Sequence, residues 1–167
     1  MEDNDIKEQF IRILQKHIGI IIKISGAYAY IRQDREDLIN DIIFELWKSY
    51  GKFNGKCKIS TWIYRISLNI SMNYKRKRSN TALFTSLNDC KNEISVLIEQ
   101  DDTPQLESLY NCIDELSEIN KAIILLYLDG NSHDEISKII GIGKSNAGTR
   151  ISRIKEQLKH SVISKNE

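Results

Sequence analysis

Hydrophobic positions recur at three- and four-residue spacings along most of this 167-residue chain, which is the period of helices that bury one face. In the N-terminal half the pattern predicts three helices, at about 5–24, 34–50 and 60–78. Asp34 is expected to cap the second helix, and Ser60 or Thr61 the third, because short polar side chains satisfy free amides at helix starts. The segment Gly51–Gly55 separates the second helix from the third.

The C-terminal half repeats the helical period in shorter pieces. Helices are predicted at about 105–116, 118–128, 133–140 and 144–160. Pro104 suits the first turn of the first of these, with Thr103 as its cap. Residues 79–103 lose the period and become polar and acidic, with room for one short helix near 94–98. We therefore predict an all-α fold, with two small helical domains at 1–80 and 105–167 joined by a flexible acidic linker at 81–104.

Composition excludes several classes of protein. Hydrophobic residues make up 41% of the chain and charged residues 28%, as in ordinary soluble proteins. The longest apolar stretch, 18–24, is interrupted by Lys23 and is too short to span a bilayer. The segment Met1–Asp5 is acidic, whereas a signal peptide begins with basic residues. We expect a cytoplasmic protein without membrane insertion.

No cluster of residues suggests catalysis or metal binding. The three cysteines, Cys57, Cys90 and Cys112, form no CxxC pair and are expected to be reduced thiols. The three histidines have no spacing that would combine with them as metal ligands. Phosphate-binding, dinucleotide-binding and nucleophile motifs are absent from the sequence. We therefore predict a protein that is not an enzyme and has neither a metal site nor a cofactor.

The net charge of +1 conceals a strong segregation of charge along the chain. Residues 46–88 contain nine basic residues, no acidic residue and seven of the thirteen aromatic residues, while 89–118 is acidic and 144–159 is basic again. Cations that neutralise phosphates and rings that stack on bases together favour single-stranded nucleic acid as a ligand. A solvated lysine face over an aromatic core explains the same pattern, and both interpretations stay open at this point.

Residues 133–158 have the pattern of a helix-turn-helix. Ser137 is small where two helices must cross, and Gly141 suits the left-handed conformation of the turn. The predicted buried stripe of the second helix is Ala147, Ile151, Ile154 and Leu158. The candidate DNA-contacting residues on its other faces are Lys144, Ser145, Asn146, Thr149, Arg150 and Arg153. A plain helical hairpin with a polar outer face is the alternative, and the basic second helix favours DNA binding.

Three segments show a resemblance to a known family. They are DREDLINDIIFELW at 34–47, KFNGK with STWIYRISLN at 52–69, and the pieces LDG, DEI and RISR between 128 and 153. Together they resemble the extracytoplasmic-function sigma factors, which are minimal promoter-specificity subunits of bacterial RNA polymerase. The resemblance covers nearly the whole chain apart from the linker. It implies two helical domains, regions two and four of the family, and binding without covalent chemistry.

The resemblance also implies roles for residues of the first domain. The segment 34–47 is similar to the helix that binds the β′ clamp of the polymerase, and the implied contacts are Asp37, Asn40, Asp41 and Glu45. The segment 52–69 is similar to the loop and helix that melt the downstream (minus-ten) element and hold a flipped base. Its implied DNA-binding residues, with the basic run after it, are Asn54, Lys56, Lys58, Ser60, Trp62, Arg65, Asn69, Lys75 and Arg76. Trp62 fits a core position as well as a base contact.

For the C-terminal domain the resemblance implies binding to the β flap and recognition of the upstream (minus-thirty-five) element in double-stranded DNA. An anti-sigma factor is a further partner that the family pattern leaves open. Gly148 and Asn73 depart from the pattern, which has a long basic residue and often an acid at these places. Gly148 fits either close approach to DNA or an absence of constraint. The alternatives are an ordinary helix-turn-helix regulator with a sensing or dimerising N-terminal domain, and a single-stranded RNA-binding protein.

Overall fold

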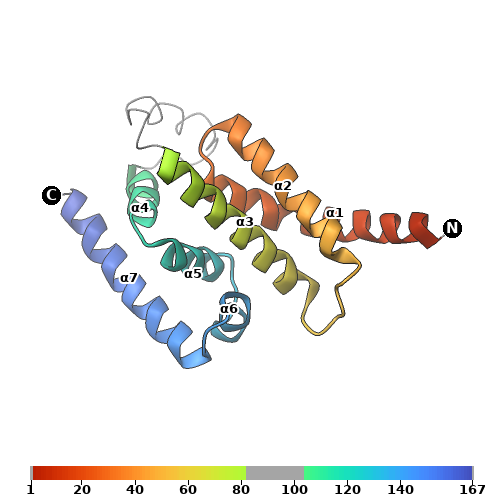
Figure 1. Ribbon diagram of the computed structural model, residues 1–167. Helices are drawn as coiled ribbons and strands as arrows, with labels where there is room; N and C mark the ends of the chain where they lie inside the picture. Colours follow the sequence, from red (N-terminus) through yellow and green to blue (C-terminus); the bar gives the residue numbers. More distant parts are fainter. Residues whose placement is uncertain (1, 82–103, 167) are drawn as a thin grey trace. The chain divides into compact units, whose positions relative to one another are not determined.

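The computed structural model describes residues 2–81 and 104–166, and within these two ranges it contains helices and no strand (Figure 1). The predicted all-α class is therefore confirmed. The chain divides into two compact units, Met1–Ile94 and Ser95–Glu167. The described helices of the first unit are α1 Glu2–Tyr28, α2 Arg32–Tyr50 and α3 Ile59–Thr81. Those of the second unit are α4 Pro104–Asp114, α5 Glu118–Leu128, α6 His133–Ile140 and α7 Lys144–Asn166.

In the first unit each of the three helices packs against the other two. Its core contains aliphatic side chains that are almost completely excluded from water, namely Ile21, Leu38, Ile42, Leu46, Ile63 and Leu68. Buried Ser25 on α1 and buried Ser67 and Ser71 on α3 supply small side chains in the same interior. The aliphatic side chains lie at helical spacing along their helices. Their burial stabilises the bundle because it removes apolar surface from water.

The predicted cap of α2 is wrong. The helix begins at Arg32, and its N-cap position is Ile31, which makes no side-chain capping bond. Asp34 instead lies in the first turn and forms an ion pair with Arg78 near the end of α3. This pair links the N-terminal end of α2 to the basic end of α3. In the structure the Asp34 carboxylate therefore makes a contact between two helices and does not cap its own helix.

The predicted cap of α3 is also wrong, since the helix begins at Ile59 and places Ser60 and Thr61 in its first turn. Two other helices are longer than predicted, with α1 reaching from Glu2 to Tyr28 and α7 reaching Asn166. Pro104 is the first residue of α4, as expected. The predicted cap at Thr103 and the short helix at 94–98 lie outside the described residues.

The second unit packs its four helices around a core that includes Ile113, Ile123, Leu126, Ile136 and Ile154. A charged group lies inside this core: Lys121 on α5 is only 1% exposed. Its Nζ donates a hydrogen bond to Asp114 Oδ1 on α4 at 2.6 Å, and the Asp114 side chain is 31% exposed. The pair joins α4 to α5, so the ammonium is buried together with an anion.

Candidate nucleic-acid and protein interfaces

The outer face of α2 carries the residues expected to bind polymerase. Asp37, Asn40 and Asp41 are exposed and lie at three- and four-residue spacing, opposite the buried residues of the same helix. Glu45 is half-buried, and its carboxylate lies 3.7 Å from Lys48 Nζ. Ser49 Oγ also donates a hydrogen bond to the Glu45 main-chain oxygen at 2.7 Å. Three of the four residues therefore share one open face, and Glu45 lies at its margin.

A further residue on this face was missed by the sequence analysis. Phe44 is 65% exposed and lies between Asn40 and Asp41 when α2 is viewed along its axis, because each residue advances by about 100°. Trp47 on the same helix is 41% exposed, although its ring centroid lies 5.1 Å from that of Phe10. Helical spacing alone could have placed Phe44 on the polar face.

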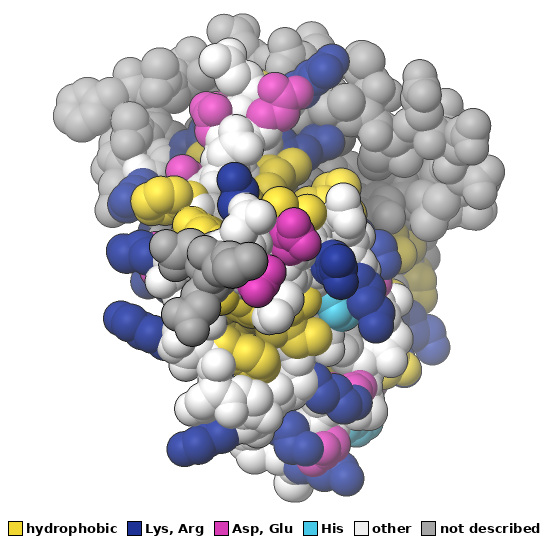
Figure 2. All heavy atoms as spheres, turned by 90° about the vertical axis from the view of Figure 1, so that its right-hand side faces the viewer, with side chains coloured by type: hydrophobic (Ala, Val, Ile, Leu, Met, Phe, Trp, Pro, Cys, Tyr) yellow, Lys and Arg dark blue, Asp and Glu magenta, His cyan; other side chains and the backbone are white. Residues whose placement is uncertain are grey.

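Exposed hydrophobic side chains are not confined to α2. On the face drawn in Figure 2, hydrophobic side chains reach the surface among lysine and arginine side chains. In the described residues, the large exposed ones besides Phe44 and Trp47 are Ile6, Ile11, Ile22, Leu128 and Ile163. Single exposed apolar residues are normal in proteins. Phe44 differs because it lies in the middle of a cluster of polar groups predicted to bind a partner.

The loop between α2 and α3 is held by its own polar groups. Asn54 Oδ1 accepts a hydrogen bond from the Lys56 backbone amide at 3.1 Å. Gly55 between them has φ 69°, a left-handed conformation that a residue without Cβ adopts at little cost. Lys56 and Lys58 are exposed on this loop. The Asn54 oxygen therefore shapes the turn, and the two lysines project their charge from it.

Trp62 belongs to an aromatic cluster at the start of α3. Its ring centroid lies 5.1 Å from that of Phe53 and 6.4 Å from that of Tyr50, and Tyr50 in turn lies 5.3 Å from Phe10. Trp62 is half-buried, so part of its indole remains at the surface. Its ring therefore packs against Phe53 and Tyr50 and keeps a portion that is accessible to solvent.

One exposed face of α3 brings together most of the residues expected to contact melted DNA. Arg65, Asn69 and Arg76 are exposed and follow Trp62 at spacings of three, seven and fourteen residues. Ser60, in the first turn, is half-buried. Lys75 is half-buried and, like Ser60, lies on the side of the helix on which Leu68 and Ser71 are buried. The structure therefore separates Ser60 and Lys75 from the other candidates on this helix.

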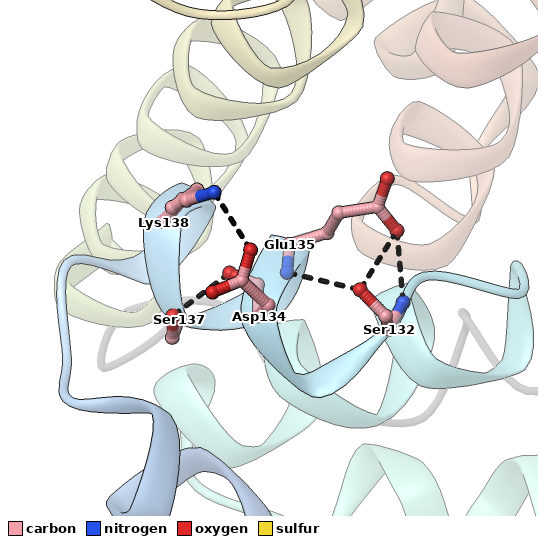
Figure 3. A network of polar contacts seen from close by, with 5 residues as sticks. All are labelled: Ser132, Asp134, Glu135, Ser137 and Lys138. Carbon is pink, nitrogen blue, oxygen red and sulfur yellow. Dashed lines mark hydrogen bonds and ion pairs between the residues drawn. The ribbon is translucent and has the colours of Figure 1, made fainter.

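The helix-turn-helix begins with a fully formed helix cap (Figure 3). Ser132 Oγ accepts from the Glu135 backbone amide at 3.2 Å, while Glu135 Oε2 accepts from the Ser132 amide at 2.9 Å. Lys138 donates to the Asp134 carboxylate at 2.6 Å, and this hydrogen bond lowers the pKa of Asp134 below its ordinary value. Gly141 ends α6 with φ 82°, the left-handed conformation expected at the turn.

The burial of α7 agrees with the sequence prediction. The stripe Ala147, Ile151, Ile154 and Leu158 is buried. Lys144, Ser145, Asn146, Thr149 and Arg153 are exposed. Arg150 differs from them because it is half-buried and makes two hydrogen bonds, from Nε to Asn146 Oδ1 at 3.3 Å and from a terminal nitrogen to Asn120 Oδ1 at 3.4 Å. The exposed side of α7 thus has polar groups that can contact base edges.

Comparisons with known proteins identify the family. Residues 13–81 match the family model for sigma-70 region 2, and residues 106–158 match the model for sigma-70 region 4. The two matched ranges coincide with the two helical parts of the chain. The chain belongs to the extracytoplasmic-function sigma factors. It is an RNA polymerase sigma factor, with a region 4 that has the helix-turn-helix described above.

Individual relatives agree with this assignment. Over 145 residues the sigma factor is 26% identical to the extracytoplasmic-function sigma-E factor of Haemophilus influenzae, spanning 78% of this chain and 76% of the relative. Over 83 residues it is 31% identical to the sigma factor SigG of Mycobacterium tuberculosis. This match spans 49% of this chain and 22% of the relative.

Solved structures share the fold. The sigma factor RpoE of Bartonella quintana, in complex with the anti-sigma factor NepR, has a TM-score of 0.67 at 19% identity and covers 95% of this chain and 96% of its own. CnrH, in complex with the cytosolic domain of CnrY, has a TM-score of 0.70 at 16% identity. The match covers 95% of this chain and 90% of CnrH. In the described part of the sigma factor, none of the helices combines the length and apolar character needed to cross a membrane.

Gly148 has a packing role that the sequence did not indicate. A Cβ built at Gly148 would lie 3.3 Å from His133 Nδ1, so the first residue of α6 occupies the space beside this glycine of α7. The tilted rings of His133 and Tyr127 have centroids 6.4 Å apart. His133 is exposed and can move outward by a few tenths of an ångström. Gly148 therefore gives α6 and α7 a close contact within region 4.

We expect Gly148→Ala to raise the stability of region 4 by roughly 0.5 kcal/mol. Alanine is favoured over glycine in a helix interior by about 1 kcal/mol, and displacement of His133 offsets part of this gain. In a His133→Ala background, Gly148→Ala should raise the stability of region 4 by the full amount of about 1 kcal/mol. Thermal unfolding of the four variants measures the difference. A larger gain with His133 present than without it would show that His133 does not oppose the added Cβ.

Proposed function

We propose that the sigma factor binds the polymerase β′ clamp through the exposed face of α2, melts the downstream element with the α2–α3 loop and α3, and recognises the upstream element with α7. The observation that carries this proposal is the distribution of the predicted residues. Most members of each set lie on an exposed helix face or loop whose supporting side is buried. Region 4 is proposed to bind the β flap as well. The proposed activity consists of binding steps alone.

Phe44 is part of the proposed polymerase-binding face. An exposed aromatic side chain surrounded by acidic and amide groups gives a protein partner apolar area to bury at the centre and charge to pair at the rim. Asp37 and Asp41 supply that charge on one side of Phe44, and the Asn40 amide lies on its other side. Basic helices on the partner would complement this arrangement electrostatically.

The face of α3 suits a base that has left the duplex stack. The accessible part of Trp62 supplies an aromatic surface for stacking, and the Asn69 amide, two turns further along α3, supplies both a donor and an acceptor. Arg65 and Arg76 lie on the same side and carry charges suited to phosphates. Lys56 and Lys58 extend the positive surface along the loop. Asn54 is assigned to loop geometry, since its oxygen holds the turn.

Asn69→Ala tests the melting role. It should reduce open-complex formation by about tenfold, because one base loses its paired hydrogen bonds, while promoter binding before melting stays unchanged. Permanganate footprinting of the holoenzyme on a promoter measures the melting. Asn73→Ala, an exposed asparagine one turn further along α3, is the matched control. Normal melting by the Asn69→Ala holoenzyme would remove Asn69 from the proposed pocket.

We also propose that an anti-sigma factor regulates this protein. The support comes from a solved structure that shares the fold, the sigma factor RpoE in complex with the anti-sigma factor NepR. A partner of this class would compete with polymerase if it covered the α2 face. The sigma factor is proposed to act in the cytoplasm, where the polymerase is found.

A further inference from the structure

Arg150 occupies an unusual place on the proposed recognition helix. Two other candidate DNA-contacting residues, Thr149 and Arg153, are exposed, whereas Arg150 is half-buried at the edge of the α7 stripe that packs on the rest of region 4. Its guanidinium bridges two asparagines, Asn146 on α7 and Asn120 in the first turn of α5. A guanidinium that is held by two hydrogen bonds within the protein is poorly placed to bind a DNA phosphate.

The chemistry of the bridge fixes the orientation of both amides. A guanidinium has only hydrogen-bond donors, so an asparagine that meets it must present its oxygen. Asn146 Oδ1 accepts from Arg150 Nε at 3.3 Å, and Asn120 Oδ1 accepts from a terminal nitrogen of the same guanidinium at 3.4 Å. Because the amide is planar, the Asn146 NH₂ group then faces away from Arg150. Asn146 is exposed, so this group is available to DNA.

We infer that Arg150 is a positioning residue which, anchored by Asn120, orients the Asn146 amide so that it presents its NH₂ group to the major groove. This inference rests on the proposed recognition of the upstream element by α7, and it specifies what Asn146 recognises there. An asparagine whose oxygen and nitrogen are both free pairs with adenine. One that presents only its NH₂ group selects a base with acceptors at its major-groove edge, and guanine has two, N7 and O6.

The prediction is that holoenzyme with the wild-type chain selects guanine at the base pair contacted by Asn146. Asn120→Ala removes the anchor without touching DNA, and Arg150→Met removes the guanidinium while keeping an apolar stem at the half-buried position. Either change frees the amide to rotate. The ratio of adenine to guanine selected at that base pair should rise by about tenfold, with the other positions unchanged.

The test is selection of upstream elements from a randomised library by holoenzymes that contain the wild type, Asn146→Ala, Asn120→Ala, Arg150→Met, or Gln157→Ala as an exposed control on α7. Circular dichroism establishes that each variant is folded. A rise in the adenine ratio for both Asn120→Ala and Arg150→Met, at the base pair where Asn146→Ala loses preference, supports the inference.

Three results would overturn the inference, and they are distinguishable. If Asn146→Ala loses preference at one base pair but Asn120→Ala and Arg150→Met keep the wild-type selection there, Asn146 contacts a base without being positioned by Arg150. If Arg150→Met weakens all sequences equally and lowers the salt dependence by about 0.9 units, Arg150 is a phosphate contact. If Asn146→Ala changes no position at all, the proposed role of Asn146 in recognition fails instead.

Discussion

Asp114→Ala should destabilise region 4 by about 3 kcal/mol, while Lys121→Met should change its stability by less than about 1 kcal/mol. The asymmetry follows from burial, since Lys121 is 1% exposed and the Asp114 side chain is 31% exposed. Loss of the carboxylate leaves a buried ammonium without its anion. Loss of the ammonium leaves the carboxylate with access to water, and the methionine fills the same volume.

The two domains provide an internal control for this measurement. Both tryptophans, Trp47 and Trp62, belong to the first unit, so tryptophan fluorescence during denaturation monitors that unit alone. Amide hydrogen exchange along α4–α7 monitors region 4. Asp114→Ala should accelerate exchange there by about a hundredfold and leave the fluorescence transition unchanged. Equal destabilisation of region 4 by Asp114→Ala and Lys121→Met would contradict the argument. The loss of the carboxylate and the loss of the ammonium would then reduce the stability by the same amount.

Arg153→Ala should relax base preference at one or two positions of the upstream element and reduce binding to the preferred sequence by roughly tenfold to a hundredfold. Arg153 is exposed on α7 and lies one helical turn beyond Thr149, on the face away from the buried stripe. A guanidinium on this face can pair with guanine through two hydrogen bonds, a contact that contributes about 1–3 kcal/mol of discrimination.

Selection of upstream elements by the Arg153→Ala holoenzyme tests this prediction, with Lys159→Ala as a control at an exposed basic position on another side of α7. A uniform loss over all sequences, with a salt dependence lower by about 0.9 units, would assign Arg153 to a phosphate. Asn146 and Thr149 would then account for base recognition.

The sequence predicted the helices and their buried faces well because both follow from a period that many residues share. The stripe of α7 is an example, since four apolar positions specify one orientation of the helix. The starts of α5, α6 and α7 agree with the sequence prediction, whereas the caps of α2 and α3 were predicted wrongly because capping preferences are weak. Asp34 does not cap α2, and its carboxylate pairs with Arg78, forty-four residues away in the chain.

Contacts between helices explain what else the sequence could not predict. Lys121 begins a hydrophobic run, and nothing in that run indicates that its buried ammonium pairs with Asp114 of α4. The close contact between Gly148 and the His133 side chain joins α7 to α6 and cannot be read from either helix alone. Arg150 was predicted as a residue that contacts DNA, and its bridge to Asn120 depends on how α5 packs against α7. The position of Phe44 on the polar face of α2 was predictable from helical spacing, and the structure shows that its side chain is exposed.

The most direct measurement for the account as a whole is reconstituted transcription with purified core polymerase on a library of genomic promoter fragments. Wild-type chain should direct specific initiation and be inert without core polymerase. Asp41→Lys should weaken binding to core polymerase by about tenfold or more and reduce initiation in proportion, because it reverses a charge on the exposed face of α2. Asp5→Lys, an exposed acid on α1, is the matched control and should have no effect. Initiation that does not depend on the wild-type chain, or full polymerase affinity in Asp41→Lys, would contradict the account.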